Sequence, residues 1–385
     1  MSQHTTDLLI FFAVVAARFF VPLGIPRYPL PFEIAAMLLD AADQTIFQAF
    51  THLDLAGYQG YDKALDVYYL TIVYLATMRN WTHIFAFEVN RFLYFYRLVG
   101  VVLFEATHVR AVLLIFPNTF EYFFIFYETV RLRWNPKRMS KRLVIGATAF
   151  IWIVIKLPQE YWIHVAQVDT TDVIKEDIFG VPTDTGWGEI IGDYPFVFIG
   201  LAILIVAIVW GAKWILDHKL PPAEWKFSFD ADAHDREVTE DQISEIVSAQ
   251  ARRLFDRELV EKIIMFSMII YIFSKIIPNL ETTNLGLALG VAVFVIFNAV
   301  LSGWLIRRGI PHRSITRQFC ATAAVNGGII VGIDLLLRYT SGGIHLGTGL
   351  FFALLLTLLI VLYDRYRPVY LARAANAGQA SSAWT

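Results

Sequence analysis

The chain has 385 residues, of which 57% are hydrophobic, 15% aromatic and only 17% charged. Soluble proteins have roughly 45–50% apolar and about 25% charged residues, so this composition excludes a disordered, collagen-like or disulfide-rich chain and argues against a soluble enzyme. The net charge of −2 gives no basic field for nucleic acid. Cys320 is the only cysteine, which excludes an intramolecular disulfide and a cysteine metal site. We expect a polytopic, all-α integral membrane protein.

A spanning helix needs about 20 mostly apolar residues, because the bilayer core is about 30 Å thick. Eleven segments fit this length, and the first three are short or carry charges, so we predict ten or eleven spans. The first segment lacks a basic n-region and a cleavage site, and we interpret it as a retained helix. The predicted spans lie near residues 7–24, 32–51, 64–79, 83–106, 109–130, 143–164, 194–216, 259–277, 283–306, 317–338 and 346–364.

The loops differ in charge, and lysine and arginine concentrate on the cytoplasmic side of membrane proteins. The 131–142 loop carries six basic residues and no acid, and 307–317 is also basic. By contrast, 157–194 holds eight acids and one lysine. Alternation along eleven spans predicts a bacterial-type plasma membrane protein with an outside N-terminus and a cytoplasmic C-terminus.

The long loop at 217–258 combines two patterns. Trp225, Phe227 and Phe229 alternate as in a short strand or an interfacial hairpin. Thr239 and Gln242 then form a capping-box pattern, which predicts an amphipathic cytoplasmic helix from about residue 240. We interpret this helix as a connector, with a gate or partner-docking helix as the alternative. The predicted domains are a transmembrane bundle at 1–164, an extracytoplasmic loop at 165–193, a transmembrane helix at 194–216, the cytoplasmic loop at 217–258, an apolar transmembrane bundle at 259–366 and a flexible tail at 367–385.

Polar residues interrupt spans two, four, five and six, whereas the later spans are close to purely apolar. An ionised side chain at the bilayer centre costs about 2.5–3.5 kcal/mol on insertion scales, so such residues must pair or line a wet cavity. We expect Arg91 and Arg97 to pair with carboxylates of spans two and five, and Glu88 to pair with Arg91. The predicted polar seam, taken as the substrate- or ion-binding set, is Asp40, Asp43, Gln44, Glu88, Arg91, Arg97, Asn118, Glu121, Glu128 and Lys156.

The seam has two interpretations. Buried pairs can act only as structural glue, or they can form a functional site, which the number of carboxylates favours. Pro117 and Pro158 lie within predicted helices, where they free backbone carbonyls. Such breaks line binding sites in transporters, and they also occur as plain kinks.

The sequence also contains candidate ligands for a metal ion or a haem. Asp40 and Asp43 could hold Mg²⁺, since hard cations prefer carboxylate oxygens, but no second aspartate pair lies inside a span, and Asp62 with Asp66 is the nearest candidate. No HExxH, GxSxG, P-loop or dinucleotide fingerprint occurs. No metal ligand is assigned and the cofactor stays unknown; a haem held by histidines from different helices remains open. The histidines near predicted span ends are His52, His83, His108 and His164.

The leading functional prediction is a transport protein, either a channel or a proton- or ion-coupled carrier of a small polar solute. Carboxylates facing arginine in a low dielectric suit proton coupling. One alternative is a membrane-embedded enzyme that acts on a lipid or isoprenoid, and another is an assembly subunit of a membrane complex. The expected partners are the lipid bilayer and a small polar solute or lipid, while the oligomeric state is open.

The predicted topology can be tested with single cysteines in a Cys320→Ser background. A membrane-impermeant maleimide added outside intact cells should label cysteines placed in 165–193 and leave those in 131–142 unlabelled, because only the acidic loop faces outward. The opposite labelling pattern would overturn the topology.

Overall fold

The computed structural model of the chain describes residues 3–53, 58–168, 170–233, 238–250, 257–276, 283–307, 315–338 and 346–382. These residues form helices and no strand, which confirms the all-α prediction. Within these described residues, five segments are long and apolar enough to cross a membrane. They are Gln3–Gly24, Lys141–Val165, Pro195–Ile215, Asn284–Trp304 and Leu346–Ala377.

The first four helices follow the predicted spans closely. They are α1 (Gln3–Phe20), extended by a 3₁₀ turn (Val21–Gly24), α2 (Pro29–Phe50), α3 (Tyr58–Asn80) and α4 (Ile84–Thr107). Helix α2 begins with Pro29, which has no amide hydrogen. None is needed in the first turn of a helix, because amides there have no acceptor within the helix. His83 caps α4, because its Nδ1 accepts a hydrogen bond from the Ala86 amide at 3.0 Å. This histidine therefore has a structural partner.

The predicted span at 109–130 is wrong as a single helix. The chain forms α5 (Ala111–Ile115), leaves helical geometry around Pro117, and resumes as α6 (Thr119–Arg131). Proline has no amide hydrogen and disfavours helix at the residue before it, so it ends the helix here.

Pro158 behaves differently from Pro117, because it lies inside an uninterrupted helical segment. This segment runs through α7 (Lys141–Phe150), a π turn (Ile151–Lys156), α8 (Leu157–Glu160) and a second π turn (Tyr161–Val165). The wider π turns on both sides of α8 accommodate Pro158, which has no amide hydrogen to donate to the helix.

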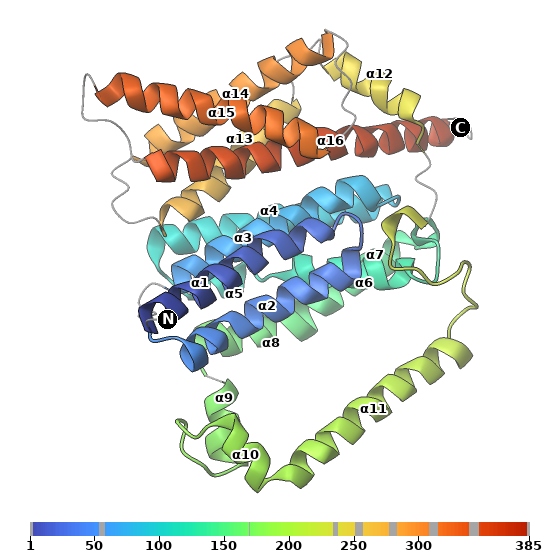
Figure 1. Cartoon of the computed structure of the whole chain (residues 1–385). Helices are drawn as coiled ribbons and strands as arrows, with labels where there is room; N and C mark the ends of the chain where they lie inside the picture. Colours follow the sequence, from blue (N-terminus) through green and yellow to red (C-terminus); the bar gives the residue numbers. More distant parts are fainter. Residues whose placement is uncertain are drawn as a thin grey trace.

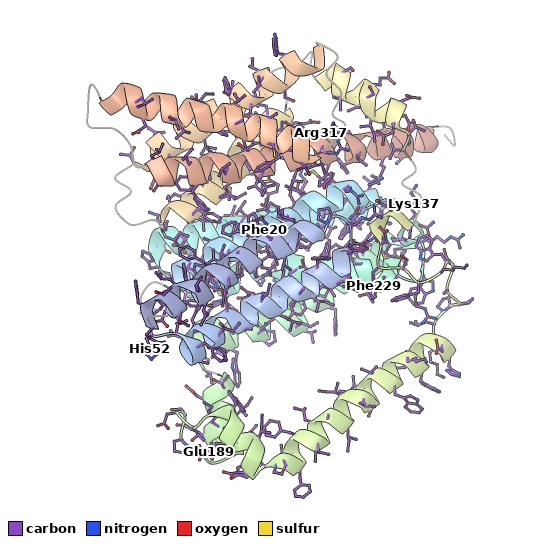
Figure 2. The ribbon with its side chains drawn as sticks, viewed as in Figure 1. Phe20, His52, Lys137, Glu189, Phe229 and Arg317 are labelled. Atoms are coloured by element: carbon purple, nitrogen blue, oxygen red, sulfur yellow. The ribbon has the colours of Figure 1, made fainter. Side chains whose placement is uncertain are left out.

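The predicted outer loop contains α9 (Thr170–Val173), a π turn (Ile174–Ile178) and α10 (Trp187–Asp193), and leads into α11 (Pro195–His218). Figure 1 shows α11 standing apart from the other long helices, and α10 is its main contact. Its side chains project on every side in Figure 2, and none of those described is buried. A helix this apolar over residues 195–212, with this exposure, fits contact with lipid.

The chain after α11 returns to the bundle and is fixed at the turn after α6. The Glu224 amide donates to the Arg133 carbonyl at 2.8 Å, and Trp225 Nε1 donates to the Arg131 carbonyl at 2.9 Å. Asp232, in a 3₁₀ turn (Ala231–Ala233), binds Arg27 at 2.5 Å and Arg79 at 2.6 Å. The alternating aromatic residues are therefore part of an irregular strap and not of a strand.

The remaining helices are α12 (Glu240–Gln250), α13 (Arg257–Ser274), α14 (Asn284–Arg307), α15 (Ile315–Arg338) and α16 (Leu346–Ser382). At the start of α12, Thr239 and Gln242 exchange side-chain-to-amide hydrogen bonds at 3.1 and 3.3 Å, the geometry of a capping box. The α16 helix extends well beyond residue 364, and Tyr370 and Arg373 are buried. Residues 367–373 therefore belong to the packed part of α16 and not to a flexible tail, and the helix continues to Ser382.

Helix α3 occupies the centre of the molecule. Its residues 64–78 are buried except for the half-buried Asp66, and it packs against α1, α2, α4, α13 and α16. The stacked rings of Tyr74 and Tyr94, with centroids 4.4 Å apart, join α3 to α4. Figure 1 shows α3 and α4 between the N-terminal helices and the layer of α13–α16. The two predicted bundles consequently share one hydrophobic core.

The close approach of α4 to the end of α5 makes one glycine critical. A Cβ added at Gly100 would lie 2.2 Å from the Phe116 Cβ, whereas one added at Gly146 on α7 would meet nothing within 4 Å. We expect Gly100→Ala to destabilise the protein by about 1–3 kcal/mol through overpacking. The matched change Gly146→Ala should be neutral or stabilise by about 0.5–1 kcal/mol. Thermal unfolding in detergent measures both, and equal melting temperatures would contradict the packing.

Candidate functional site

An arginine in the first helix organises the largest polar site. Arg18 on α1 is only 4% exposed, and its guanidinium contacts Asp40 and Asp43 of α2. It also lies 3.4 Å from Asp62 and 3.1 Å from Asp66 of α3. These five residues are called the aspartate cluster. The i, i+3 spacing of Asp40 and Asp43 and the i, i+4 spacing of Asp62 and Asp66 place each pair on one helix face.

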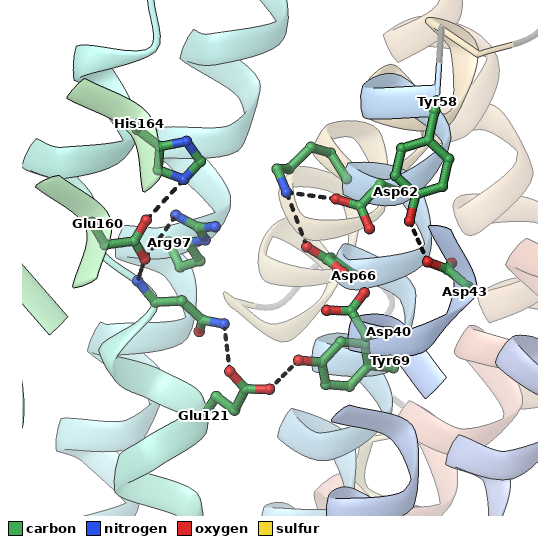
Figure 3. Close-up of polar contacts among 12 residues, drawn as sticks. Asp40, Asp43, Tyr58, Asp62, Asp66, Tyr69, Arg97, Glu121, Glu160 and His164 are labelled. Carbon is green, nitrogen blue, oxygen red and sulfur yellow. Dashed lines mark hydrogen bonds and ion pairs between the residues drawn. The ribbon is translucent and has the colours of Figure 1, made fainter. Parts of the chain in front are cut away.

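Two further side chains complete the surroundings of the aspartate cluster. Tyr58 donates its hydroxyl hydrogen to Asp43, and Lys63 binds Asp62 at 2.8 Å and Asp66 at 3.4 Å (Figure 3). Four carboxylates thus face two cations, which leaves two formal negative charges uncompensated when all four are ionised. The side chain of Asp40 is 30% exposed, so the cluster is reachable from outside the core.

A second polar group surrounds the break between α5 and α6. Arg97 of α4 donates to the Phe116 carbonyl at 3.0 Å, and the Asn118 amide donates to Glu160 Oε1 at 3.0 Å. Glu160 also lies 3.8 Å from Arg97 and 3.0 Å from His164. Charged side chains therefore satisfy the backbone groups that Pro117 leaves without helical partners, as buried backbone requires.

Glu121 joins this region to the aspartate cluster. Its carboxylate accepts hydrogen bonds from the Tyr69 hydroxyl and, at 2.9 Å, from Asn118 Nδ2. Tyr69 lies one helical turn beyond Asp66 on α3, and Figure 3 shows its ring beside Asp40 and Asp66. The predicted residues Asp40, Asp43, Asn118 and Glu121 therefore do lie in one connected polar region.

Two more buried carboxylates, Glu33 and Glu128, lie on α2 and α6, the helices that carry Asp40 and Glu121. Glu128 accepts from Trp81 Nε1 at 2.9 Å and from Arg131 Nε at 2.8 Å. Glu33 of α2 is fully buried, and neither of its oxygens has a hydrogen-bond partner among the described residues. Lys156 is also buried, where it binds Gln159 at 3.0 Å and lies 4.1 Å from the centre of the Tyr122 ring.

The predicted pairing of Arg91 with carboxylates of spans two and five is wrong. Arg91 binds Glu261 of α13 at 2.6 Å, and Glu88 lies 3.6 Å away on the same helix. Glu88 accepts from Tyr370 of α16, and Glu261 accepts from Tyr74 at 3.0 Å. Arg91 and Glu88 thus connect α4 to α13 and α16, and not to the helices that carry the aspartate cluster. They act there as interhelical ties.

Gln44 is the other predicted site residue that the fold moves away from the site. It lies on α2 between Asp43 and Phe47, both of which are buried, but Gln44 itself is exposed. A one-residue step turns the side chain by about 100° on a helix with 3.6 residues per turn. Gln44 therefore lies one turn after Asp40 on α2, but its side chain points to the surface and not toward Arg18.

Three aspartates have the spacing of a cation site. Carboxylate oxygens of Asp40, Asp62 and Asp66 lie within 4.8 Å of one another. Arg18 contacts all three, so its guanidinium stands where a shared cation would sit. This set differs from the predicted Asp40–Asp43 pair, because Asp43 turns toward Tyr58.

No protein-family model, curated protein or solved structure matches this chain. The functional argument accordingly depends on the geometry described above.

Several residues of the site were missed in the sequence. Arg18 interrupts an apolar first helix, and this interruption was the available signal. Glu33 stands near the start of its predicted span, where a carboxylate ordinarily faces water. Tyr58, Lys63 and Tyr69 belong to a segment that reads as an aromatic surface belt until α3 is known to be central.

The aspartate cluster predicts a strong effect of Arg18→Leu. Removing the guanidinium leaves the fully buried Asp43 without its cation, which should cost about 3–5 kcal/mol. Adding Asp43→Asn should restore part of the melting temperature. As a control, Arg138→Leu removes an exposed pair with Glu224 and should cost about 1 kcal/mol or less. Unchanged melting of Arg18→Leu in detergent would refute this role.

Proposed function

We propose that the protein is an integral membrane transport protein that couples the movement of a small polar solute to a proton or cation bound at the aspartate cluster. The observation that carries the proposal is the excess of carboxylates over cations around Arg18, Lys63 and their four aspartates. Crowded like charges in a poorly hydrated place favour uptake of a proton or another cation. Partial exposure of Asp40 and Asp66 supports exchange with water.

The broken helix supports the same function. Irregular backbone at membrane depth is tolerated where protein buries it or where it lines a cavity, and discontinuous helices form the binding sites of many transporters. The break at Pro117 lies beside Arg97, Glu160 and Glu121, so charged groups and free backbone groups meet in one region. This arrangement suits binding of a polar solute next to the coupling site.

The proposal includes a plasma membrane location with all eleven predicted segments crossing. In that topology the aspartate cluster lies in the outer half of the bilayer and Arg131 lies near the cytoplasmic surface. The positive loop at 131–142 supports this orientation.

A membrane-embedded enzyme acting on a lipid is the second candidate, because Asp40, Asp62 and Asp66 have the spacing of a divalent-cation site. Such an enzyme would need Mg²⁺ or Mn²⁺ at these carboxylates. Calorimetric titration of the purified protein with Mg²⁺ distinguishes the two candidates. Binding that Asp62→Asn abolishes would favour the enzyme.

Charge movement in proteoliposomes tests the transport proposal. After a pH jump, solid-supported membrane electrophysiology should record a transient current from protons entering the aspartate cluster. We expect Asp66→Asn to reduce this current about tenfold, because it removes one of the two aspartates that contact both Arg18 and Lys63. Glu189→Gln, on the exposed face of α10, serves as the control and should behave as wild type. A wild-type current equal to that of protein-free liposomes would overturn the proposal.

A further inference from the structure

Glu33 is the one fully buried carboxylate of the described residues that has no hydrogen-bond donor on either oxygen. It lies in the first turns of α2, on the helix that also carries Asp40 and Asp43. Its exposed fraction is 0%, so water outside the protein does not solvate it. A carboxylate charge in such a place is strongly disfavoured without a partner, whereas the neutral acid is tolerated.

Two carboxylates of α6 lie within electrostatic range of Glu33. Helices α2 and α6 pack against each other, and both Glu121 and Glu128 are near enough to act electrostatically on Glu33. These two residues are seven positions apart, which places them on one face of α6 and about 10 Å apart along its axis at 1.5 Å per residue. Of the titratable groups on the other helices that contact α2, Tyr69 of α3 also acts on Glu33. We call Glu121, Glu33 and Glu128 the carboxylate row.

The members of the carboxylate row differ in how they are held. Tyr69 and Asn118 donate hydrogen bonds to Glu121, while Trp81 and Arg131 donate to Glu128. Fixed donors stabilise a negative charge on a carboxylate. The surroundings of Glu121 and Glu128 therefore favour the ionised carboxylate, whereas the surroundings of Glu33 favour the protonated acid.

We propose that Glu33 carries a proton between Glu121 and Glu128. In the transfer step the Glu33 side chain first swings to within hydrogen-bond distance of Glu121 or Glu128, since neither of its oxygens has a partner at rest among the described residues. The O–H bond of the Glu33 carboxyl then breaks, and an O–H bond forms on that carboxylate. Glu33 is left as a carboxylate and regains its proton from the other flanking residue, so no other bond changes. This inference rests on the proposed transport function and supplies a path for the proton through the protein.

The path has an entrance and an exit among residues already described. Tyr69, which donates to Glu121, lies close to Asp40 and Asp66 of the partly exposed aspartate cluster. At the other end Arg131 holds Glu128 and ends α6, directly before the basic loop. The row therefore connects the aspartate cluster with the opposite end of the helices, along the interface of α2 with α6.

The experiment compares three variants in the pH-jump current measurement. In wild type we expect a fast phase, from proton binding at the aspartate cluster, and a slower phase, from transfer past Glu33. Glu33→Gln keeps the shape of the side chain and removes its exchangeable proton. It should keep the fast phase and slow the second phase by about 100-fold or more. Glu33→Asp keeps an acid at a shorter reach, and should retain a slower but measurable second phase.

Glu105→Gln is the matched control. Glu105 is also a buried glutamate with one oxygen lacking a partner among the described residues, but it lies on α4, outside the carboxylate row. It should keep both phases. Infrared difference spectra after the same pH jump give an independent measure, since a band of a protonated carboxyl should disappear in Glu33→Gln and persist in Glu105→Gln.

The outcomes separate the two proposals. A wild-type second phase in Glu33→Gln would overturn the role of Glu33 and leave the transport function standing. Absence of any protein-dependent current in wild type would overturn both. If Glu33→Gln does not fold, Glu33→Asp decides alone, and a second phase equal to that of wild type at every pH would overturn the role of Glu33.

Discussion

The burial of one guanidinium determines how the N-terminal helices are arranged. Arg18 lies at 4% exposure among carboxylates of two neighbouring helices, so α1, α2 and α3 meet at a single charged centre. Desolvating a charge is costly, and only close, well-placed partners offset that cost. Once these partners are fixed, the faces of α2 and α3 are fixed as well. Glu33 and Tyr69 then point toward α6, and the rest of the polar region follows.

The break at Pro117 shows a second use of charge in this fold. A helix interrupted at depth exposes amide and carbonyl groups that need partners. Arg97 and Glu160 supply them, and Glu160 in turn contacts His164 on the helix containing the two π turns. Two irregular helices thus compensate each other, and the region between them combines fixed charges with backbone groups. Polar ligands bind in such surroundings.

Helix positions were predictable from the sequence to a greater extent than helix partners. Apolar runs located most long helices within a few residues, because the need for about 20 apolar residues is local. They did not give the break at Pro117 or the extension of α16 beyond residue 364. Spacing also placed Asp40 and Asp43 on one face. The partner of Arg91, however, is Glu261, which lies 170 positions away, and no spacing rule reaches that far. Glu33 was missed for the same reason, because its burial depends on α6 covering it.

The isolation of α11 has a consequence for the site if this helix crosses the bilayer as proposed. Its apolar stretch from Pro195 to Ile215 has 21 residues and a length of about 31 Å at 1.5 Å per residue, close to the thickness of a hydrocarbon core. Among the described residues no other long helix packs along α11, so in the proposed topology its tilt would follow hydrophobic mismatch with the surrounding lipid. The strap after α11 is hydrogen-bonded to the carbonyl of Arg131, the residue that holds Glu128. In the proposed topology, a change in membrane thickness that tilts α11 would pull on this strap and so on the Glu128 end of the carboxylate row.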